Sequence, residues 1–292
     1  MDEQPLPGGN AGGAVLAGGT VRRPAGPWTP AVHALLRHLE ARGFAGAPRV
    51  LGLDEQGREV LTYLPGETVG TTRPWPAWVH SDEALRQVGH WLRGYHDAVS
   101  DFVPPAEARW RTSRRPWQPG YVVGHNDAAP YNAVWQRGPG EGDGTGGPGG
   151  PGGPGGAGGA GGPGASGGRL VGFFDWDFAA PCPPIWDLAF VVFCWVPFHA
   201  KDVMAAEGFT AFADRPRRLG LLLDAYGYKG SVTDILDAVR SRIGDIATSL
   251  RELAEGGDPL FARLVREGVV DGLDRAMAEM PASVEEFRNR AR

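Results

Sequence analysis

A tract made almost entirely of glycine, proline and alanine interrupts this chain of 292 residues between Gly138 and Gly168. Such a segment lacks apolar side chains to bury, so we expect it to be a disordered surface insertion. Short apolar runs flank it, at residues 133–135 and 170–174. Because the entropy of loop closure grows only slowly with length, the fold accommodates the tract most easily if these runs are the two strands of a hairpin.

The residues up to about Gly66 carry strand patterns around a single helical pattern. Thr29 followed by Pro30 predicts a helix start, because a capping side chain precedes a proline at the first helical position, and the helix runs to about Arg42. Short apolar runs bounded by turn residues predict strands on either side of it. We expect these strands at residues 14–17, 20–22, 49–53 and 59–64. This part of the chain therefore predicts a small lobe with a sheet and one helix.

Beyond this point helical patterns dominate. Apolar residues recur at helical spacing after Ser81 and after Thr233, and residues 184–196 are apolar nearly all round, as expected of a buried helix. The sequence thus predicts an α+β protein with an N-terminal lobe at residues 1–66 and a larger helical lobe at 67–292, with the insertion at 138–168 inside a hairpin. A cleft between two lobes is the default place for a ligand.

Bulk properties exclude several classes of function. A net charge of −5 gives no basic footprint for nucleic acid. No apolar stretch approaches the roughly 20 residues of a membrane helix, and the first residues show no signal-peptide pattern. The two cysteines, Cys182 and Cys194, are too few for a tetrahedral zinc site and fit a reducing cytoplasm, where we expect the protein to be located.

Three side chains in the middle of the chain carry a recognisable chemistry. Asp127 is followed five residues later by Asn132, and Asp175 follows the second strand of the expected hairpin. Phosphoryl transfer needs a carboxylate that orients or deprotonates the attacking hydroxyl, and oxygen ligands that hold magnesium against the phosphates. Asp127 can supply the first part, and the amide and carboxylate oxygens of the other two residues the second, if the hairpin brings them together.

This arrangement resembles the aminoglycoside phosphotransferase and choline kinase-like phosphotransferases of the protein-kinase-like superfamily. The similarity rests on His125-x-Asp127 with its following Asn132, on Asp175, and on Trp186-Asp187-Leu188-Ala189, where the aspartate of the family steadies the catalytic loop. Pro65-Gly66-Glu67 resembles the segment just past the connector between the lobes. The resemblance implies a bilobal protein-kinase-like fold and the use of ATP and Mg²⁺.

The resemblance also implies roles for individual residues. Asp127 would be the catalytic base, and Asn132 and Asp175 the magnesium ligands. The stretch Thr62-Tyr63-Leu64 would hold the adenine edge through backbone groups. The glycine loop at residues 8–13, with Gly9 and Gly12, would cover the phosphates, since glycine allows a close approach of the backbone.

Two departures concern the phosphate-binding side of the site. Where the family usually has a lysine on the third strand, this chain has Arg22 and Arg23, and we prefer Arg22 because it directly follows the apolar strand residues. The following helix has no carboxylate to pair with it before Glu40. The lysine–glutamate pair of the family is therefore expected to be missing.

We therefore expect an ATP- and Mg²⁺-dependent phosphotransferase that acts on a hydroxyl of a small molecule, aminoglycoside-like or another metabolite. The alternative is a nucleotide- or ligand-binding protein of the same fold with lost or weak catalysis, which the missing pair favours. The acceptor and the oligomeric state do not follow from the sequence. Acidic residues of the helical lobe either meet an amine-rich substrate or form a solvated face: Asp224, Asp245, Glu252 and Asp271.

Overall fold

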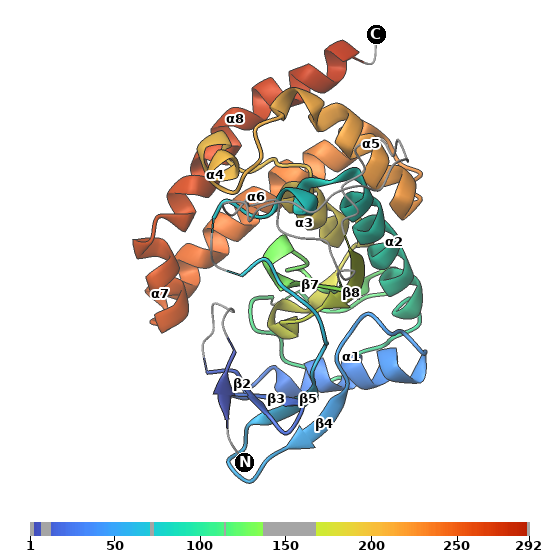
Figure 1. Cartoon of the computed structure of the whole chain (residues 1–292), viewed down its shortest axis with the longest axis vertical. Helices are drawn as coiled ribbons and strands as arrows, with labels where there is room; N and C mark the ends of the chain where they lie inside the picture. Colours follow the sequence, from blue (N-terminus) through green and yellow to red (C-terminus); the bar gives the residue numbers. More distant parts are fainter. Residues whose placement is uncertain (1–2, 7–12, 71–72, 114, 137–167, 291–292) are drawn as a thin grey trace, which may run out of the picture.

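The computed structural model describes residues 3–6, 13–70, 73–113, 115–136 and 168–290. Figure 1 shows a small lobe of strands and one helix, which contains the N-terminus, beneath a larger helical lobe that contains the C-terminus. The predicted α+β arrangement of a small strand-rich lobe and a large helical lobe is therefore confirmed.

The small lobe is built on an antiparallel five-stranded sheet with the order β1-β2-β3-β5-β4. Gly18 and Gly19, which join β2 and β3, both have positive φ angles (58° and 77°), the conformation that two-residue hairpin turns require. The strands are β1 (Gln4–Pro5), β2 (Val15–Ala17), β3 (Thr20–Arg23), β4 (Val50–Leu53) and β5 (Glu59–Thr62).

The single helix of this lobe is α1 (Thr29–Ala41). It begins one residue earlier than predicted: Thr29 is its first residue and caps nothing, Trp28 is the N-cap, and Pro30 lies in the first turn. Leu35, Leu36 and Leu39 on one face are fully buried. Helix α1 therefore supplies the apolar layer under the small lobe.

A connector leads into the helical lobe through the short 3-10 helix η1 (Ala77–His80) to α2 (Asp82–Ala98). The Ser81 hydroxyl caps α2 by accepting a hydrogen bond from the backbone N–H of Ala84 at 3.1 Å. Helix α2 packs along α5 (Arg215–Tyr226), with the buried face that its helical spacing predicts.

Two small strand pairs lie between the lobes. Strand β6 (Val122–Gly124) pairs with β9 (Ala180–Cys182), and β7 (Ala133–Gln136) pairs with β8 (Arg169–Phe173). The second pair is the hairpin predicted around the glycine-rich tract. Single turns follow, at η2 (Pro130–Asn132) and η3 (Trp176–Phe178).

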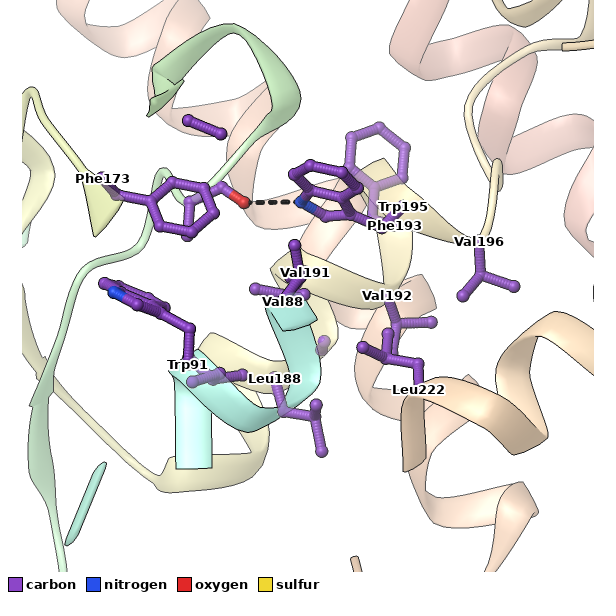
Figure 2. Packing of buried hydrophobic residues seen from close by; sticks show 14 of the residues in the cluster. Val88, Trp91, Phe173, Leu188, Val191, Val192, Phe193, Trp195, Val196 and Leu222 are labelled. Atoms are coloured by element: carbon purple, nitrogen blue, oxygen red, sulfur yellow. Dashed lines mark hydrogen bonds between the residues drawn. The ribbon is translucent and has the colours of Figure 1, made fainter. Parts of the chain in front are cut away.

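The centre of the large lobe is α3 (Pro184–Trp195), which is buried along most of its length. Figure 2 shows Leu188, Val191 and Val192 of this helix facing Val88 of α2 and Leu222 of α5. The indole N–H of Trp195 donates to the backbone oxygen of Ala128 at 2.8 Å, the dashed line of Figure 2, so the core is tied directly to the loop after β6.

The remaining helices are α4 (Lys201–Ala206), η4 (Phe212–Asp214), α6 (Val232–Glu255), α7 (Pro259–Arg266) and α8 (Val269–Arg290). In Figure 1, α4, α6 and α8 lie on the side of this core away from the small lobe, and α7 lies at its flank. Among the helices of the described ranges, none is both long and apolar enough to cross a membrane.

Candidate active site

The hairpin of β7 and β8 brings the three motif residues to one place. Asn132 directly precedes β7 and Asp175 follows β8, and their neighbours Ala133 and Phe173 are partners in the ladder. The backbone N–H of Phe174 donates to the oxygen of Asn132 at 3.0 Å, which closes this end of the hairpin. Residues separated by more than forty positions in sequence therefore meet because the strands pair.

The Asp127 carboxylate is held by two side chains of its own loop. The amide nitrogen of Asn132 donates to Oδ2 of Asp127 at 2.8 Å, and the Tyr131 hydroxyl donates to Oδ1 at 3.0 Å. Burial, together with the nearby Asp175 carboxylate, raises the pKa of Asp127 to about 8. The group is thus oriented and has the strongly shifted pKa typical of functional carboxylates.

The backbone around Asp127 is anchored from below by Asp187, which is fully buried at the start of α3. Its two oxygens accept hydrogen bonds from the backbone N–H groups of His125 (3.0 Å) and Asn126 (2.8 Å), and Nε2 of His96 lies 3.1 Å away. Burial alone would raise the pKa of Asp187, but the hydrogen bond from His96 and the backbone donors lower it below its ordinary value. Asp187 is therefore an ionised support for the loop.

Arg23 enters the site from the small lobe and meets three carboxylates. Its Nε lies 2.8 Å from Oε1 of Glu59, Nη1 lies 3.0 Å from Oδ1 of Asp175, and Nη2 contacts Asp177. Glu59 is the direct partner of Arg23 across β3 and β5, and its other oxygen lies 3.0 Å from Nε2 of His33 on α1. A cation on β3 is thus paired with a carboxylate of the next strand, while α1 contributes a histidine to the same group.

A second arginine closes this network. Arg111 donates to Oδ2 of Asp177 at 2.9 Å, and its guanidinium lies over the ring of Trp28 at 4.6 Å. Because burial raises the pKa of Asp177 while the two arginines oppose that rise, the charges compensate one another. The carboxylates of this region are therefore each matched by a cation from another segment.

A cavity of about 1410 Å³ opens beside these groups, with Asp127, Asn132 and Asp175 in its wall. Its other walls come from the segment around residues 110–116 and from helices α3, α4, α6, α7 and α8. The volume exceeds the 300–1,000 Å³ usual for sites of small ligands. With Asp127 and Asp175 included, the described part of the wall carries seven acidic side chains and five arginines; the others are Arg73, Arg111, Arg115, Arg242, Arg275, Asp202, Glu207, Asp245, Glu252 and Glu267.

The donor set fits a magnesium ion that is completed by phosphate oxygens and water. Within the described part of the chain, no group of three or more His, Cys, Asp or Glu side chains is placed to hold a metal by itself. Magnesium commonly uses one or two carboxylates together with substrate phosphates. The Asp175 carboxylate and the Asn132 side-chain oxygen meet that requirement, and the repulsion between Asp127 and Asp175 that the raised pKa reflects would be relieved by a cation between them.

Comparison with known proteins places the chain in a family. No family model matches it. The trifolitoxin immunity protein of Rhizobium leguminosarum bv. trifolii is 33% identical over 276 residues, which cover 89% of this chain and 90% of that protein. The chain belongs to the trifolitoxin immunity protein family. The match spans both lobes, so the membership applies to the chain as a whole rather than to one segment.

The fold of this trifolitoxin immunity family member is shared with solved phosphotransferases. The GDP complex of aminoglycoside 2'-phosphotransferase-IIIa matches with a TM-score of 0.52 and 15% identity, covering 96% of this chain and 93% of that one. An ethanolamine kinase of Plasmodium vivax matches with a TM-score of 0.50 and 10% identity, covering 99% and 83%. The protein-kinase-like fold predicted from the resemblance is therefore confirmed.

Arg22, the arginine preferred from the sequence for contact with the phosphates, lies away from Asp175. The nearest acidic oxygen to Arg22 is Oδ2 of Asp54 at 3.9 Å, at the turn after β4, whereas Arg23 contacts Asp175. Successive strand residues face opposite sides, so only one of the two can reach the site. The cross-strand register, in which Glu59 stands opposite Arg23, is the signal that distinguishes them.

The candidates for the adenine edge lie at the entrance of the interlobe connector. Thr62 ends β5 and its hydroxyl accepts from the backbone N–H of Arg49 at 2.8 Å, while Tyr63 is exposed and Leu64 half-buried. Gly9 and Gly12 lie outside the described residues. Of the four acidic residues considered for substrate contact, Asp245 and Glu252 line the cavity, and Asp224 and Asp271 do not.

Proposed function

We propose that this protein is a phosphotransferase that moves the γ-phosphoryl group of ATP to a hydroxyl of a small molecule. The observation that carries the proposal is the Asp127 carboxylate, which is hydrogen-bonded by Asn132 and Tyr131 and faces a large cavity beside Asp175. A half-buried, oriented carboxylate with a raised pKa suits a group that accepts a proton near neutral pH.

The reaction follows from these positions. The oxygen of the acceptor hydroxyl forms a bond to the γ-phosphorus, the bond from that phosphorus to the bridging oxygen of ADP breaks, and the hydroxyl proton passes to Asp127. Magnesium held by Asn132 and Asp175 would neutralise negative charge on the phosphates. Asp187 keeps the backbone of the loop in place through its contacts with His125 and Asn126.

For the cation that contacts the phosphates we propose Arg23 in place of Arg22. Its guanidinium lies against Asp175 and is oriented by Glu59. Arginine can bind phosphate oxygens through two parallel hydrogen bonds. For the adenine edge, the backbone of Thr62, Tyr63 and Leu64 stays our candidate.

The relative's name suggests what the acceptor is. The trifolitoxin immunity protein is named for immunity against a toxin, and we propose that phosphorylation of a toxin hydroxyl is how this protein acts.

One observation favours a second candidate, a binding protein without turnover. All three nitrogens of the Arg23 guanidinium contact carboxylates, which leaves the phosphates to compete with Glu59, Asp175 and Asp177 for it. A protein of this kind would bind nucleotide or toxin and confer immunity by sequestration.

The test compares wild type with Asp127→Asn, and uses Asp224→Asn, an exposed position outside the cavity, as the matched control. Thermal shift with Mg²⁺-ATP, ATP alone and Mg²⁺ alone reports binding, and ADP release with a panel of hydroxyl compounds and toxin-containing extracts reports turnover. We expect stabilisation by Mg²⁺-ATP in all three proteins, with turnover reduced by about 10²-fold or more only in Asp127→Asn.

The outcomes separate the candidates. Stabilisation without turnover of any acceptor, unchanged by Asp127→Asn, would favour the binding protein. Full turnover in Asp127→Asn would sink the mechanism, and an absence of any response to millimolar nucleotide would sink both candidates.

A further inference from the structure

Helix α6 sends one buried arginine to the catalytic loop. Arg242 is only 9% exposed, and its Nη2 donates to the backbone oxygen of Asn126 at 3.2 Å and lies 3.4 Å from the side-chain oxygen of the same residue. Nη1 lies 3.2 Å from Oδ2 of Asp245, one turn further along α6. The arginine thus joins a helix of the cavity wall to the residue that precedes Asp127.

Asn126 is a conformationally costly position. Its φ angle is 61°, in the left-handed region that glycine favours and that other residues, asparagine more readily than most, adopt less often. Such a conformation persists only where surrounding contacts fix it. The side-chain amide of Asn126 donates to the oxygens of Gly124 and Ala180, and its N–H donates to Asp187.

None of those contacts involves the backbone carbonyl of Asn126, which accepts a hydrogen bond from Arg242. The carbonyl of Asn126 belongs to the same peptide plane as the N–H of Asp127, and that N–H donates to Nδ1 of His125 at 3.3 Å. Rotation of this plane would therefore redirect the Asp127 side chain. Asp187 holds the peptide plane that contains the N–H of Asn126, and Arg242 holds the peptide plane that contains its carbonyl.

Arg242 is itself held rigidly. Its guanidinium carbon lies 5.4 Å from the ring centre of Trp186 and 5.5 Å from that of Phe190, both on α3. Contacts of this kind orient a guanidinium and offset part of the cost of burying it. The helix α3 that carries Asp187 therefore also supports Arg242.

We propose that Arg242 is a positioning residue for the catalytic aspartate, acting through the carbonyl of Asn126. This inference rests on the proposed phosphotransfer. A planar fork with two contacts to Asn126 and one to Asp245 fixes direction in a way that a lysine ammonium cannot. A misplacement on the order of 1 Å in a reacting group can cost about 10²-fold in rate. We therefore expect the loss of Arg242 to lower kcat rather than to change KM.

The experiment uses Arg242→Lys and Arg242→Met, with Arg251→Met as the matched control, since Arg251 is exposed on the same helix and pairs with Asp274. Two readouts are taken: kcat and KM for Mg²⁺-ATP in ADP release, and hydrogen exchange of the amides at residues 125–127 in the nucleotide-free protein. We expect kcat to fall about 10-fold in Arg242→Lys and about 10²-fold in Arg242→Met, with KM for ATP within about 2-fold of wild type.

Hydrogen exchange can be measured without turnover, so it tests the positioning role of Arg242 separately from the proposed phosphotransfer. We expect the amides at 125–127 to exchange at least about 10-fold faster in both Arg242 variants, while those of β6 and β9 keep wild-type rates, which also reports an intact fold. Faster exchange with no turnover in wild type would sink the proposed function and keep the positioning role. Wild-type exchange at 125–127, or a loss confined to KM, would overturn the inference.

Discussion

Nη1 of Arg23 lies 3.0 Å from Oδ1 of Asp175, although 152 residues separate the two positions. Arg23 ends a strand of the small lobe and Asp175 follows a strand of the large lobe, so the pair bridges the two lobes at the site. This contact with Asp175 distinguishes Arg23 from its neighbour Arg22.

Removal of Arg23 should destabilise the protein, whereas removal of Arg22 should not. Arg23→Met removes the cation that Glu59, Asp175 and Asp177 share. Glu59 keeps His33 and Asp177 keeps Arg111, but Asp175 loses its cation, and breaking a buried ion pair costs about 3 kcal/mol or more. Arg22→Met loses only a contact of 3.9 Å with Asp54, and we expect a change within about 0.5 kcal/mol. Urea unfolding of both variants measures the difference between their free energies of unfolding. Equal losses would show that the ion pairs of Arg23 contribute no more to stability than the contact of Arg22 with Asp54.

Asp187→Ala should be among the most destabilising single changes in the chain. It deprives the N–H groups of His125 and Asn126 and the ring of His96 of their acceptor in a fully buried place. We expect a loss of about 3 kcal/mol in the free energy of unfolding. The control is Asp97→Ala, an exposed residue of α2 that lies 3.7 Å from Arg93, for which about 0.5 kcal/mol or less is expected. A small effect at Asp187 would mean that water replaces its hydrogen bonds.

Gly172→Ala should disturb the contact between β8 and the small lobe. A Cβ atom at this position would lie 2.3 Å from the backbone oxygen of Gly46, and neither backbone can yield easily. We expect a loss of more than about 1 kcal/mol with a lower Tm. Gly220→Ala on the exposed face of α5, where a Cβ would meet nothing within 4 Å, should stabilise by about 0.5–1 kcal/mol. Calorimetry of the pair measures both, and two shifts of the same sign would contradict the steric account.

Stability should fall in mild acid partly because of His199. Burial lowers the pKa of this ring to about 4, and its Nδ1 accepts from the backbone N–H of Ala200 at 2.8 Å. Between pH 6.5 and 4 the unfolded chain binds a proton at His199 that the folded protein does not, so the free energy of unfolding decreases as the pH falls through this window. The contribution is at most about 3.5 kcal/mol, from a shift of about 2.5 pKa units at roughly 1.4 kcal/mol per unit.

The measurement is urea unfolding of wild type and His199→Asn at intervals from pH 8 to pH 4. The asparagine oxygen can still accept from Ala200, so the two curves should run parallel above pH 7 and diverge below it, with the variant losing less. Curves that stay parallel down to pH 4 would rule out a titration of His199 in this window.

Sequence patterns predicted the parts of this fold that depend on neighbours in the chain. The apolar runs around the glycine-rich tract pair as β7 and β8, and the predicted start at Ser81 begins α2. The N-cap of helix α6 lies two residues earlier than the predicted cap Thr233, because Ser231 forms the capping box with Asp234. The hairpin then places Asn132 beside Asp175, as its two strands require.

The features that the sequence left open depend on partners far away in the chain. The pairing of β6 with β9 joins segments separated by the glycine-rich tract, so no local signal announces it. Arg22 and Arg23 are both half-buried on β3, and only the position of Glu59 on β5 decides which one enters the site. Arg242 has the spacing of the apolar face of α6, three residues after Val239, and its charge is accommodated there because Trp186 and Phe190 provide rings for its guanidinium.

The far end of the hairpin has an architectural consequence. Gln136 and Arg169 stand opposite each other, joined by a hydrogen bond of 2.7 Å, and Gln87 of α2 holds Gly168 and Leu170 next to them. The described chain thus ends at Gln136 and resumes at Gly168 beside the same anchors, while Asn132 and Asp175 lie at the opposite end of the hairpin. A fluorescent or affinity module inserted between Gln136 and Gly168 should therefore leave the contacts among Asp127, Asn132 and Asp175 unchanged.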